Sequence, residues 1–248
     1  MLDFISQKDN RHVVIVGHGS SRRPDAAAST LSIGKNISEF ERFAGVHCAF
    51  MKQDVNISSL FKNLPNGIEL EIVPHFAAAG TFVKDRLESY LSPERKRFNA
   101  TKVHAPLGLH PGIAMHLKML SKQAKVDDII LVAHGSTTSI GPALTAQNLC
   151  QELQSPDLNC HVLFLSNEPH VNEWRNLNIG RNVLVCPLFA GAGAHLCEDI
   201  PQAFALKKTP LAGMTYDIDD HRIQFEFPLM NDHLLTKLAL DDLGFIRP

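Results

Sequence analysis

The amino-acid sequence predicts an α/β protein built from two similar lobes, each with a mainly parallel sheet. Two observations lead to this prediction. Short apolar runs alternate along the chain with longer segments of helical periodicity. In addition, three blocks of the first half recur in the second half in the same order.

Six short apolar runs have the length and composition of buried strands. They are VVIVG (13–17), HCAFM (47–51), ELEIV (69–73), IILVA (129–133), HVLFL (161–165) and NVLVC (182–186). Between them, the spacing of apolar residues predicts helices over roughly 24–43, 80–97, 110–124, 141–154 and 230–242. Because strands that alternate with helices are typical of parallel sheets, this alternation indicates an α/β fold with a mainly parallel sheet.

The repeated blocks define the expected domain organisation. VVIVGHGSS (13–21) resembles IILVAHGST (129–137), VPHFAAAGTFVKD (73–85) resembles CPLFAGAGAHLCE (186–198), and APLGLHP (105–111) more faintly resembles FPLMNDH (227–233). Strand-plus-glycine turns can look alike by chance, but three blocks in order at a nearly constant offset favour a true repeat. We therefore expect lobes over residues 1–124 and 125–248, packed with a cleft between them.

Composition excludes several classes of protein. The 248 residues are 44% hydrophobic and 20% charged, with a formal net charge of −2, which gives no electrostatic reason to bind nucleic acid or an anionic membrane. No apolar run approaches the ~20 residues of a membrane helix. The start MLDFISQKDNRH lacks the features of a secretory signal, and the five cysteines show no CxxC spacing. We expect a cytoplasmic protein with reduced thiols.

A His-Gly-Ser turn follows one predicted strand in each half. The two copies are Gly17-His18-Gly19-Ser20 and Ala133-His134-Gly135-Ser136. Ligands of parallel α/β sheets bind at the carboxyl ends of strands, where glycine permits close approach and serine can cap a helix or donate to an anion. Each histidine could instead be satisfied within its own turn. Two copies at the same strand end favour a binding site.

The segment CPLFAGAGAHLCEDIP (186–201) places His195, Glu198 and Asp199 directly after a predicted strand. Neighbouring strand ends converge in such folds, so His195 and His134 are expected to lie close together. Two imidazoles and a carboxylate suit Fe²⁺, Co²⁺, Ni²⁺ or Zn²⁺. A structural zinc site would have four ligands with cysteine prominent. The pattern therefore indicates an open site for transient metal binding.

The two acids near His195 have competing explanations. Pro201 suits the first turn of a helix, so Asp199 either caps that helix or takes part in the site. Glu198 has no such structural role, and we favour it for proton or metal transfer over the alternative of a solvated surface acid. Arg22 follows the first His-Gly-Ser turn, where it could bind a carboxylate or phosphate in bidentate fashion or remain solvated.

These motifs resemble the class II tetrapyrrole chelatases, specifically the sirohydrochlorin cobaltochelatase/ferrochelatase (CbiX-like) group. The resemblance covers most of the chain and rests on VIVGHGSSRR (14–23), ILVAHGS (130–136) and CPLFAGAGAHLCEDIP (186–201). The last segment is similar to the family's P-x-F…G-x-H…D-I-P block. Glu168-Pro169 and PLGLHP (106–111) support the resemblance.

The resemblance implies two facing flavodoxin-like lobes with a tetrapyrrole held between them. The family's paired metal-handling histidines would correspond to His134 and His195, which we expect to be catalytic. We expect Glu198 to be the third catalytic residue because of its own position in the sequence. The implied reaction inserts Co²⁺, Fe²⁺ or Ni²⁺ into a carboxylate-rich tetrapyrrole such as sirohydrochlorin, in cobalamin- or siroheme-type biosynthesis. The ion is a substrate, and no permanently bound cofactor is expected.

The substrate's carboxylate groups would be bound by side chains and backbone around the cleft. The expected substrate-binding residues are His18, Ser20, Arg22, Ser136 and Gly193. Because both lobes lie in one chain, we expect a monomer that binds a small tetrapyrrole and neither nucleic acid nor membrane.

Three departures from the family pattern stand out. Phe82 occupies the position in the first lobe that aligns with His195, so only the second lobe has both histidines. Ala133 replaces the first glycine of the second turn, and Ser166-Asn167 stands where an acidic residue is often found. These departures leave efficiency and substrate identity open.

Two other functions fit parts of the pattern. A non-catalytic carrier of metal or tetrapyrrole would keep the fold and the metal pair. A histidine-dependent phosphatase or mutase would use His18 and Arg22 on a phosphoryl group, but such enzymes commonly carry arginine just before the histidine. Here Val16-Gly17 precedes it, which disfavours this alternative.

Overall fold

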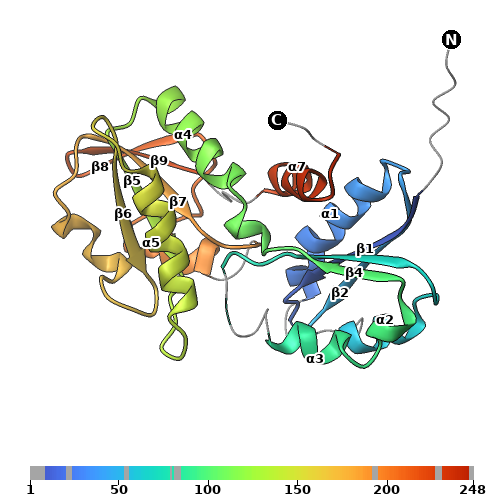
Figure 1. Ribbon diagram of the computed structural model, residues 1–248. Helices are drawn as coiled ribbons and strands as arrows, with labels where there is room; N and C mark the ends of the chain where they lie inside the picture. Colours follow the sequence, from blue (N-terminus) through green and yellow to red (C-terminus); the bar gives the residue numbers. More distant parts are fainter. Residues whose placement is uncertain are drawn as a thin grey trace, which may run out of the picture. The chain divides into compact units, whose positions relative to one another are not determined.

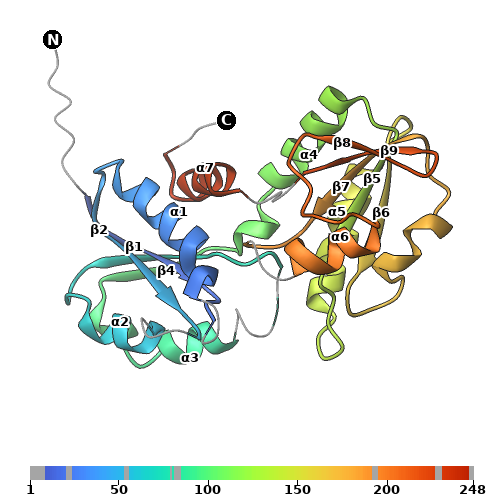
Figure 2. The same cartoon turned by 180° about the vertical axis from the view of Figure 1, so that it is seen from behind.

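The computed structural model describes residues 9–20, 24–52, 56–78, 80, 85–191, 195–226 and 231–245. It divides into two compact units (Figures 1 and 2). Unit 1 comprises Met1–Phe76, Thr81–Leu107 and Asp232–Pro248, and unit 2 comprises Ala77–Gly80 and Gly108–Asn231. Each unit contains one mostly parallel sheet, which confirms the predicted α/β class.

Unit 1 has a four-stranded parallel sheet, here called sheet A, in the order β2-β1-β3-β4. Its strands are β1 (Asp9–Gly17), β2 (Phe43–Phe50), β3 (Glu69–Pro74) and β4 (Ala100–Val103). Its helices include α1 (Ala28–Ser38), α2 (Ile57–Asn63) and α3 (Leu87–Leu91). The sequence did not predict β4 or α2, because β4 is a short, polar edge strand and α2 is only seven residues long.

Unit 2 has a five-stranded sheet, sheet B, in the order β6-β5-β7-β9-β8. The parallel strands are β5 (Asp128–Ala133), β6 (Asn159–Phe164), β7 (Asn182–Pro187) and β9 (His221–Phe225). The edge strand β8 (Thr215–Ile218) is antiparallel to β9. This hairpin was not predicted from the sequence. The helices are α4 (Gly112–Ala124), α5 (Gly141–Leu153) and α6 (Ile200–Ala203).

The two sheets share the arrangement of their first three strands. β1 lies between β2 and β3, and β5 lies between β6 and β7. The central strands carry the most apolar runs of the chain, and residues 13–16 and 129–132 have no exposed surface. Such complete burial requires helices on both faces of the sheet, which explains why these runs are uniformly apolar and do not alternate with polar residues.

The compact units differ from the expected lobes at two helices. α4 belongs to unit 2, whereas α7 (Asp232–Asp242) belongs to unit 1 and packs against α1. Ser29 donates to the Asp232 carboxylate at 2.5 Å, and Asn36 donates to the Thr236 hydroxyl at 3.2 Å. The division at residues 124/125 therefore separates the sequence repeats, but it does not separate the compact units.

A half-buried ion network fastens the end of α7 to sheet A. Arg11 donates to the Glu71 carboxylate at 2.9 Å and to the Leu243 carbonyl at 3.0 Å. Burial opposes ionisation of Glu71, but hydrogen bonds from His104 (2.5 Å) and Arg11 outweigh it and lower the Glu71 pKa to about 2. The Arg11 guanidinium also lies 5.2 Å from the ring centroid of Phe245.

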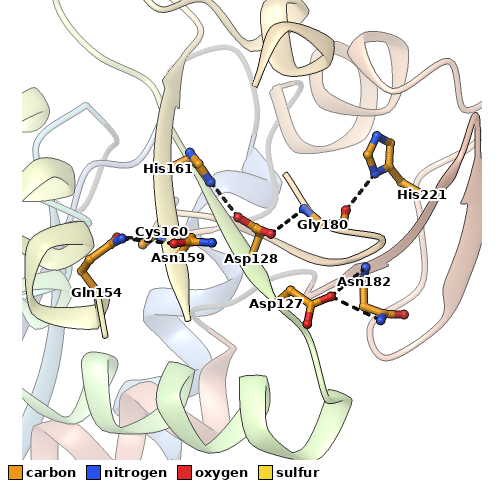
Figure 3. Close-up of polar contacts among 9 residues, drawn as sticks. All are labelled: Asp127, Asp128, Gln154, Asn159, Cys160, His161, Gly180, Asn182 and His221. Carbon is orange, nitrogen blue, oxygen red and sulfur yellow. Dashed lines mark hydrogen bonds and ion pairs between the residues drawn. The ribbon is translucent and has the colours of Figure 1, made fainter. Parts of the chain in front are cut away.

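A second polar network lies at the amino ends of the strands of sheet B (Figure 3). The buried Asp128 carboxylate accepts hydrogen bonds from His161 Nε2 at 2.8 Å and from the Gly180 backbone at 2.7 Å. His221 Nδ1 donates to the Gly180 carbonyl at 2.9 Å. These contacts join β5, β6, β9 and the loop before β7, so His161 and His221 have structural roles at the edge opposite the carboxyl ends.

All five cysteines are free. Among the described residues, no helix has the length and apolar character needed to cross a membrane.

Candidate functional site

His134 follows the last residue of β5, at the carboxyl edge of sheet B, and its side chain is exposed. Its Nδ1 lies 3.1 Å from the Gly135 carbonyl oxygen and 3.5 Å from Ser166 Oγ. Because a carbonyl can only accept, Nδ1 carries the hydrogen in the neutral ring and Nε2 carries the lone pair. A backbone carbonyl that fixes the tautomer in this way is the usual support for a metal-binding histidine.

The turn that carries His134 is held by Asn167. The Asn167 Oδ1 accepts from the Ser136 backbone at 2.5 Å, and its Nδ2 donates to the Ser136 carbonyl at 3.3 Å. Gly135 has a φ of +74°, and a Cβ there would lie 2.2 Å from Asn167 Oδ1. Glycine is therefore required both by the backbone conformation and by the approach of the amide.

If His134 handles metal as the resemblance implies, Asn167→Ala should lower metal-transfer activity through the position of His134. The substitution removes two hydrogen bonds from the turn, at a cost of about 1–3 kcal/mol if the backbone groups stay buried. The kcat should fall, whereas the KM for the tetrapyrrole should change little. Asn167→Asp keeps the acceptor for the Ser136 N–H and should retain more activity. Equal losses in both variants would contradict a positioning role for the acceptor.

The hydroxyl of Ser136 stabilises its own turn. Its Oγ accepts from the backbone N–H groups of Thr138 (3.2 Å) and Ser139 (3.1 Å). The hydroxyl hydrogen can still donate to a ligand or to Thr138 Oγ1 at 3.3 Å. The predicted substrate contact of Ser136 therefore remains a prediction, next to a clear structural role.

His195 begins a π-helical turn, His195–Asp199, that continues directly into α6. The side chain of His195 lies outside the described residues. Leu196 and Ile200 are buried and fix the turn against the core of unit 2, whereas Glu198 and Asp199 face outward. π-helical turns are rare in proteins overall, but those that occur are often found at functional sites.

Asp199 does not cap α6, so that interpretation is wrong. It precedes the first residue of α6, but its backbone is already helical and its side chain makes no capping hydrogen bond. The physical reason is that the chain enters α6 from the π-helical turn, which leaves no free helix start to cap.

Asp199 instead lines a cavity of about 620 Å³. Ser166, whose Oγ lies 3.5 Å from His134 Nδ1, belongs to the same cavity wall, whereas Glu198 does not line it. The lining residues all belong to unit 2: Leu165, Ser166, His170, Val171, Asn172, Arg175, Asp199, Gln202 and Ala203.

The walls of this cavity are fixed by hydrogen bonds. His170 accepts at Nδ1 from the Asn172 backbone and donates from Nε2 to the Leu165 carbonyl, both at 3.2 Å. Arg175 donates to Asp219 at 2.7 Å, and its guanidinium lies 4.4 Å from the Trp174 ring centroid. Asp219 offsets the charge of Arg175, and Asp199 adds a carboxylate to the cavity wall.

The matching turn in unit 1 carries His18 at the carboxyl end of β1. Its exposed ring meets Phe76 edge-on, with centroids 6.4 Å apart. Desolvation and the nearby Lys52 ammonium lower the His18 pKa, so this imidazole is neutral at pH 7. Ser20 follows in the same turn. Arg22, Gly193 and Phe82 lie outside the described residues.

The sequence missed a third carboxylate at the carboxyl edge of sheet B. Glu226 follows β9 directly, and its backbone N–H donates to the Val185 carbonyl at 3.0 Å. Desolvation raises its pKa, which makes it a candidate proton acceptor in the same unit as His134. Its position just before the faint repeat FPLMNDH was the available signal.

Within the described ranges, no group of three or more potential metal ligands is assembled.

Comparison with known proteins identifies the family. The CbiX family model matches residues 12–124 and again residues 128–243. The chain belongs to the CbiX family. The two CbiX matches coincide with the two halves of the sequence repeat, and they confirm the resemblance inferred from the motifs.

Individual relatives of this CbiX protein are distant. A protein from Halobacterium salinarum named "probable sirohydrochlorin cobaltochelatase" is 22% identical over 220 residues, which cover 77% of this chain and 75% of that protein. SirB from Bacillus subtilis with Fe³⁺ has a TM-score of 0.70 at 15% identity, covering 94% of each chain. The sirohydrochlorin chelatase SirB from subspecies spizizenii, in complex with cobalt, has a TM-score of 0.63 at 13% identity, covering 94% of this chain and 93% of that one.

A larger protein contains the same fold. DR2241 from Deinococcus radiodurans, described as similar to chelatases with two additional novel domains, has a TM-score of 0.68 at 16% identity. The match covers 96% of this chain, which spans about 55% of that protein. These structures share the fold of this CbiX protein.

Proposed function

We propose that this chain inserts a divalent metal ion, Co²⁺ or Fe²⁺ with Ni²⁺ as a third candidate, into a carboxylate-rich tetrapyrrole such as sirohydrochlorin, in cobalamin- or siroheme-type biosynthesis. The observation that carries the proposal is His134, held in one tautomer at the carboxyl edge of sheet B in a double CbiX chain. The relatives named for sirohydrochlorin and the cobalt and iron complexes of SirB support this substrate and these metals.

The reaction requires the macrocycle to lose two pyrrole protons while the ion loses its water. In the proposed mechanism, the lone pair of His134 Nε2 binds the ion loosely or accepts a pyrrole proton. His195, at the start of the π-helical turn, would supply the second imidazole. Two imidazoles can release the ion to the macrocycle, whereas several thiolates would retain it. His18, Ser20, Arg22, Ser136 and Gly193 would bind carboxylate groups of the substrate.

The carboxylate that works with this pair is Asp199 in our proposal, in place of Glu198. Asp199 shares the cavity wall with Ser166 and brings a carboxylate to it. Such a cavity attracts a hydrated divalent cation, because carboxylate, hydroxyl and amide oxygens can all accept hydrogen bonds from the coordinated water. Glu226, with its raised pKa, is the proposed acceptor for a released proton.

We expect Asp199→Asn to lower kcat/KM for the metal ion by about tenfold to a hundredfold, comparable to losses at other groups that support metal sites. The isosteric change removes the charge and keeps the size. Glu198→Gln, one residue away on the same turn, should have a much smaller effect because Glu198 lies outside the cavity wall. A larger loss in Glu198→Gln would reverse this assignment.

The function is tested by the absorbance of sirohydrochlorin in the presence of the purified chain and Co²⁺, Fe²⁺ or Ni²⁺, each added separately. Heat-denatured protein controls for spontaneous metallation. Acceleration by the native chain is expected, and the order of rates identifies the preferred ion. Tight binding of sirohydrochlorin without acceleration for any ion would instead favour a carrier, the function that keeps this fold without catalysis.

We further propose that the chain acts as a monomer, because it carries both CbiX repeats itself. Its unpaired cysteines support the proposal of a cytoplasmic location.

A further inference from the structure

Two histidines of unit 1 that the proposed function does not use lie side by side on sheet A. His12 is on β1 and His47 is on the edge strand β2, and both are half-buried. His12 Nδ1 and His47 Nε2 are 3.0 Å apart. The ring planes differ by only 8°, and the centroids are 5.3 Å apart. Two ring nitrogens of different strands therefore point at each other across one hydrogen bond.

The strand register places a glycine beneath the two rings. Gly45 pairs with His12 and lies two residues before His47, so all three share one face of the sheet. A Cβ on Gly45 would lie 2.7 Å from His12 Nδ1 and 2.8 Å from His47 Nε2. Any larger residue would push the rings apart, so the glycine keeps open the space in which the two nitrogens meet.

We propose that His12 and His47 form a bidentate site for a divalent transition-metal ion, with water in the remaining coordination positions. Metal–imidazole bonds of about 2.0–2.1 Å at a right angle place the two nitrogens about 3 Å apart. The observed separation of 3.0 Å matches this distance. Both rings must tilt, so that their lone pairs meet at an ion that lies off the line between the two nitrogens.

The protonation states suit this site. Desolvation lowers the pKa of His12, and desolvation together with His12 lowers the pKa of His47, so both rings are neutral at pH 7. In the empty pair one ring donates its hydrogen to the other. On metal binding that hydrogen moves to the far nitrogen of the same ring through water, so the number of bound protons does not change.

The site would hold its ion loosely. In the part of the chain that the structure describes, no third histidine, cysteine or acid joins the pair. Two imidazoles with water exchange metal readily, and Ni²⁺ and Cu²⁺ are the ions whose tetragonal geometry matches the right angle. This inference depends on the geometry of unit 1 alone and does not require chelatase activity.

Calorimetric titration with Ni²⁺ tests the site in a parent protein that already carries His134→Ala and His195→Ala. These two changes remove the imidazoles of the proposed functional site, so metallation and binding at His12 and His47 are measured separately. The parent should still bind one equivalent of Ni²⁺. Adding His12→Asn or His47→Asn should weaken this binding by about tenfold or more.

Two further variants separate a metal site from a hydrogen-bonded pair or a folding effect. Gly45→Ala keeps both histidines but pushes the rings apart, and it should also weaken Ni²⁺ binding by about tenfold. His233→Asn removes an exposed histidine of α7 and should change nothing. Circular dichroism establishes that each variant is folded. If the parent binds no Ni²⁺, or if folded His12→Asn and His47→Asn bind it as the parent does, the proposal is overturned.

Discussion

His134→Ala should lower the rate of metal insertion into sirohydrochlorin by about 10²–10⁴-fold, the range for loss of a positioned acid–base group. The side chain is exposed at the end of β5, so its removal leaves no cavity in the core. The melting temperature should therefore stay close to that of the unchanged protein. Both quantities are measured on the same preparation, by sirohydrochlorin absorbance and by thermal unfolding.

The identity of the atom that acts can be tested at the same position. His134→Gln places an amide where the imidazole stood, and amide oxygen is a poorer ligand for Co²⁺ or Ni²⁺ than imidazole nitrogen. This variant should remain strongly impaired. His233→Asn serves as the matched control and should retain full activity. Near-normal metallation by folded His134→Ala would show that this residue is not part of the mechanism. The matching His18 of unit 1 would then be the next candidate.

Removal of α7, by ending the chain after Asn231, should unfold unit 1 and leave unit 2 folded. The helix buries four leucines, and complete burial of each contributes about 1.5–3 kcal/mol. The sum is comparable with the total stability of a typical domain, which is about 5–15 kcal/mol. The truncation also removes the partners of Ser29, Asn36 and Arg11. The buried leucines of the helix are Leu234, Leu235, Leu238 and Leu240.

Hydrogen exchange resolves the two units in this experiment. Amides of β1 to β4 should lose protection in the truncated chain, whereas those of β5 to β7 should keep it. Leu235→Ala in the full chain provides a milder test and should cost about 2–5 kcal/mol. The exposed Lys237→Ala, on the same helix, should have little effect. If the amides of sheet A remain fully protected without α7, this helix is not needed for the folding of unit 1.

The strands could be predicted from the sequence where they are buried on both faces. The runs 13–16 of β1 and 129–132 of β5 are entirely apolar and fully buried, a pattern that burial on both sides produces. β4 and β8 are short edge strands with polar, half-exposed residues, so their local pattern does not distinguish them from loops. The placement of α4 in unit 2 and of α7 in unit 1 was not predictable. A sequence repeat shows local similarity and does not show which sheet a helix packs against.

The residues of the candidate site also include some that the sequence could predict and some that it could not. His134 was predictable because a histidine after a buried strand lies at the carboxyl edge of a parallel sheet. Asn167 was not, because its role depends on a hydrogen bond across to Ser136 that only the fold creates. The expectation that Asp199 caps a helix was wrong, because proline at position 201 suggests a helix start and the π-helical turn before it removes that start.

The exchange of helices has a consequence for synthesis on the ribosome. Strands β1 to β4 are made first, yet α7, which completes their unit, emerges after every other described element. Unit 2 can finish folding once residue 231 is free, at a time when unit 1 still exposes the apolar surface that α7 will cover. At about 5–20 residues per second this surface stays open for many seconds. Chaperones should therefore bind the nascent chain at unit 1, whose strands are synthesised first.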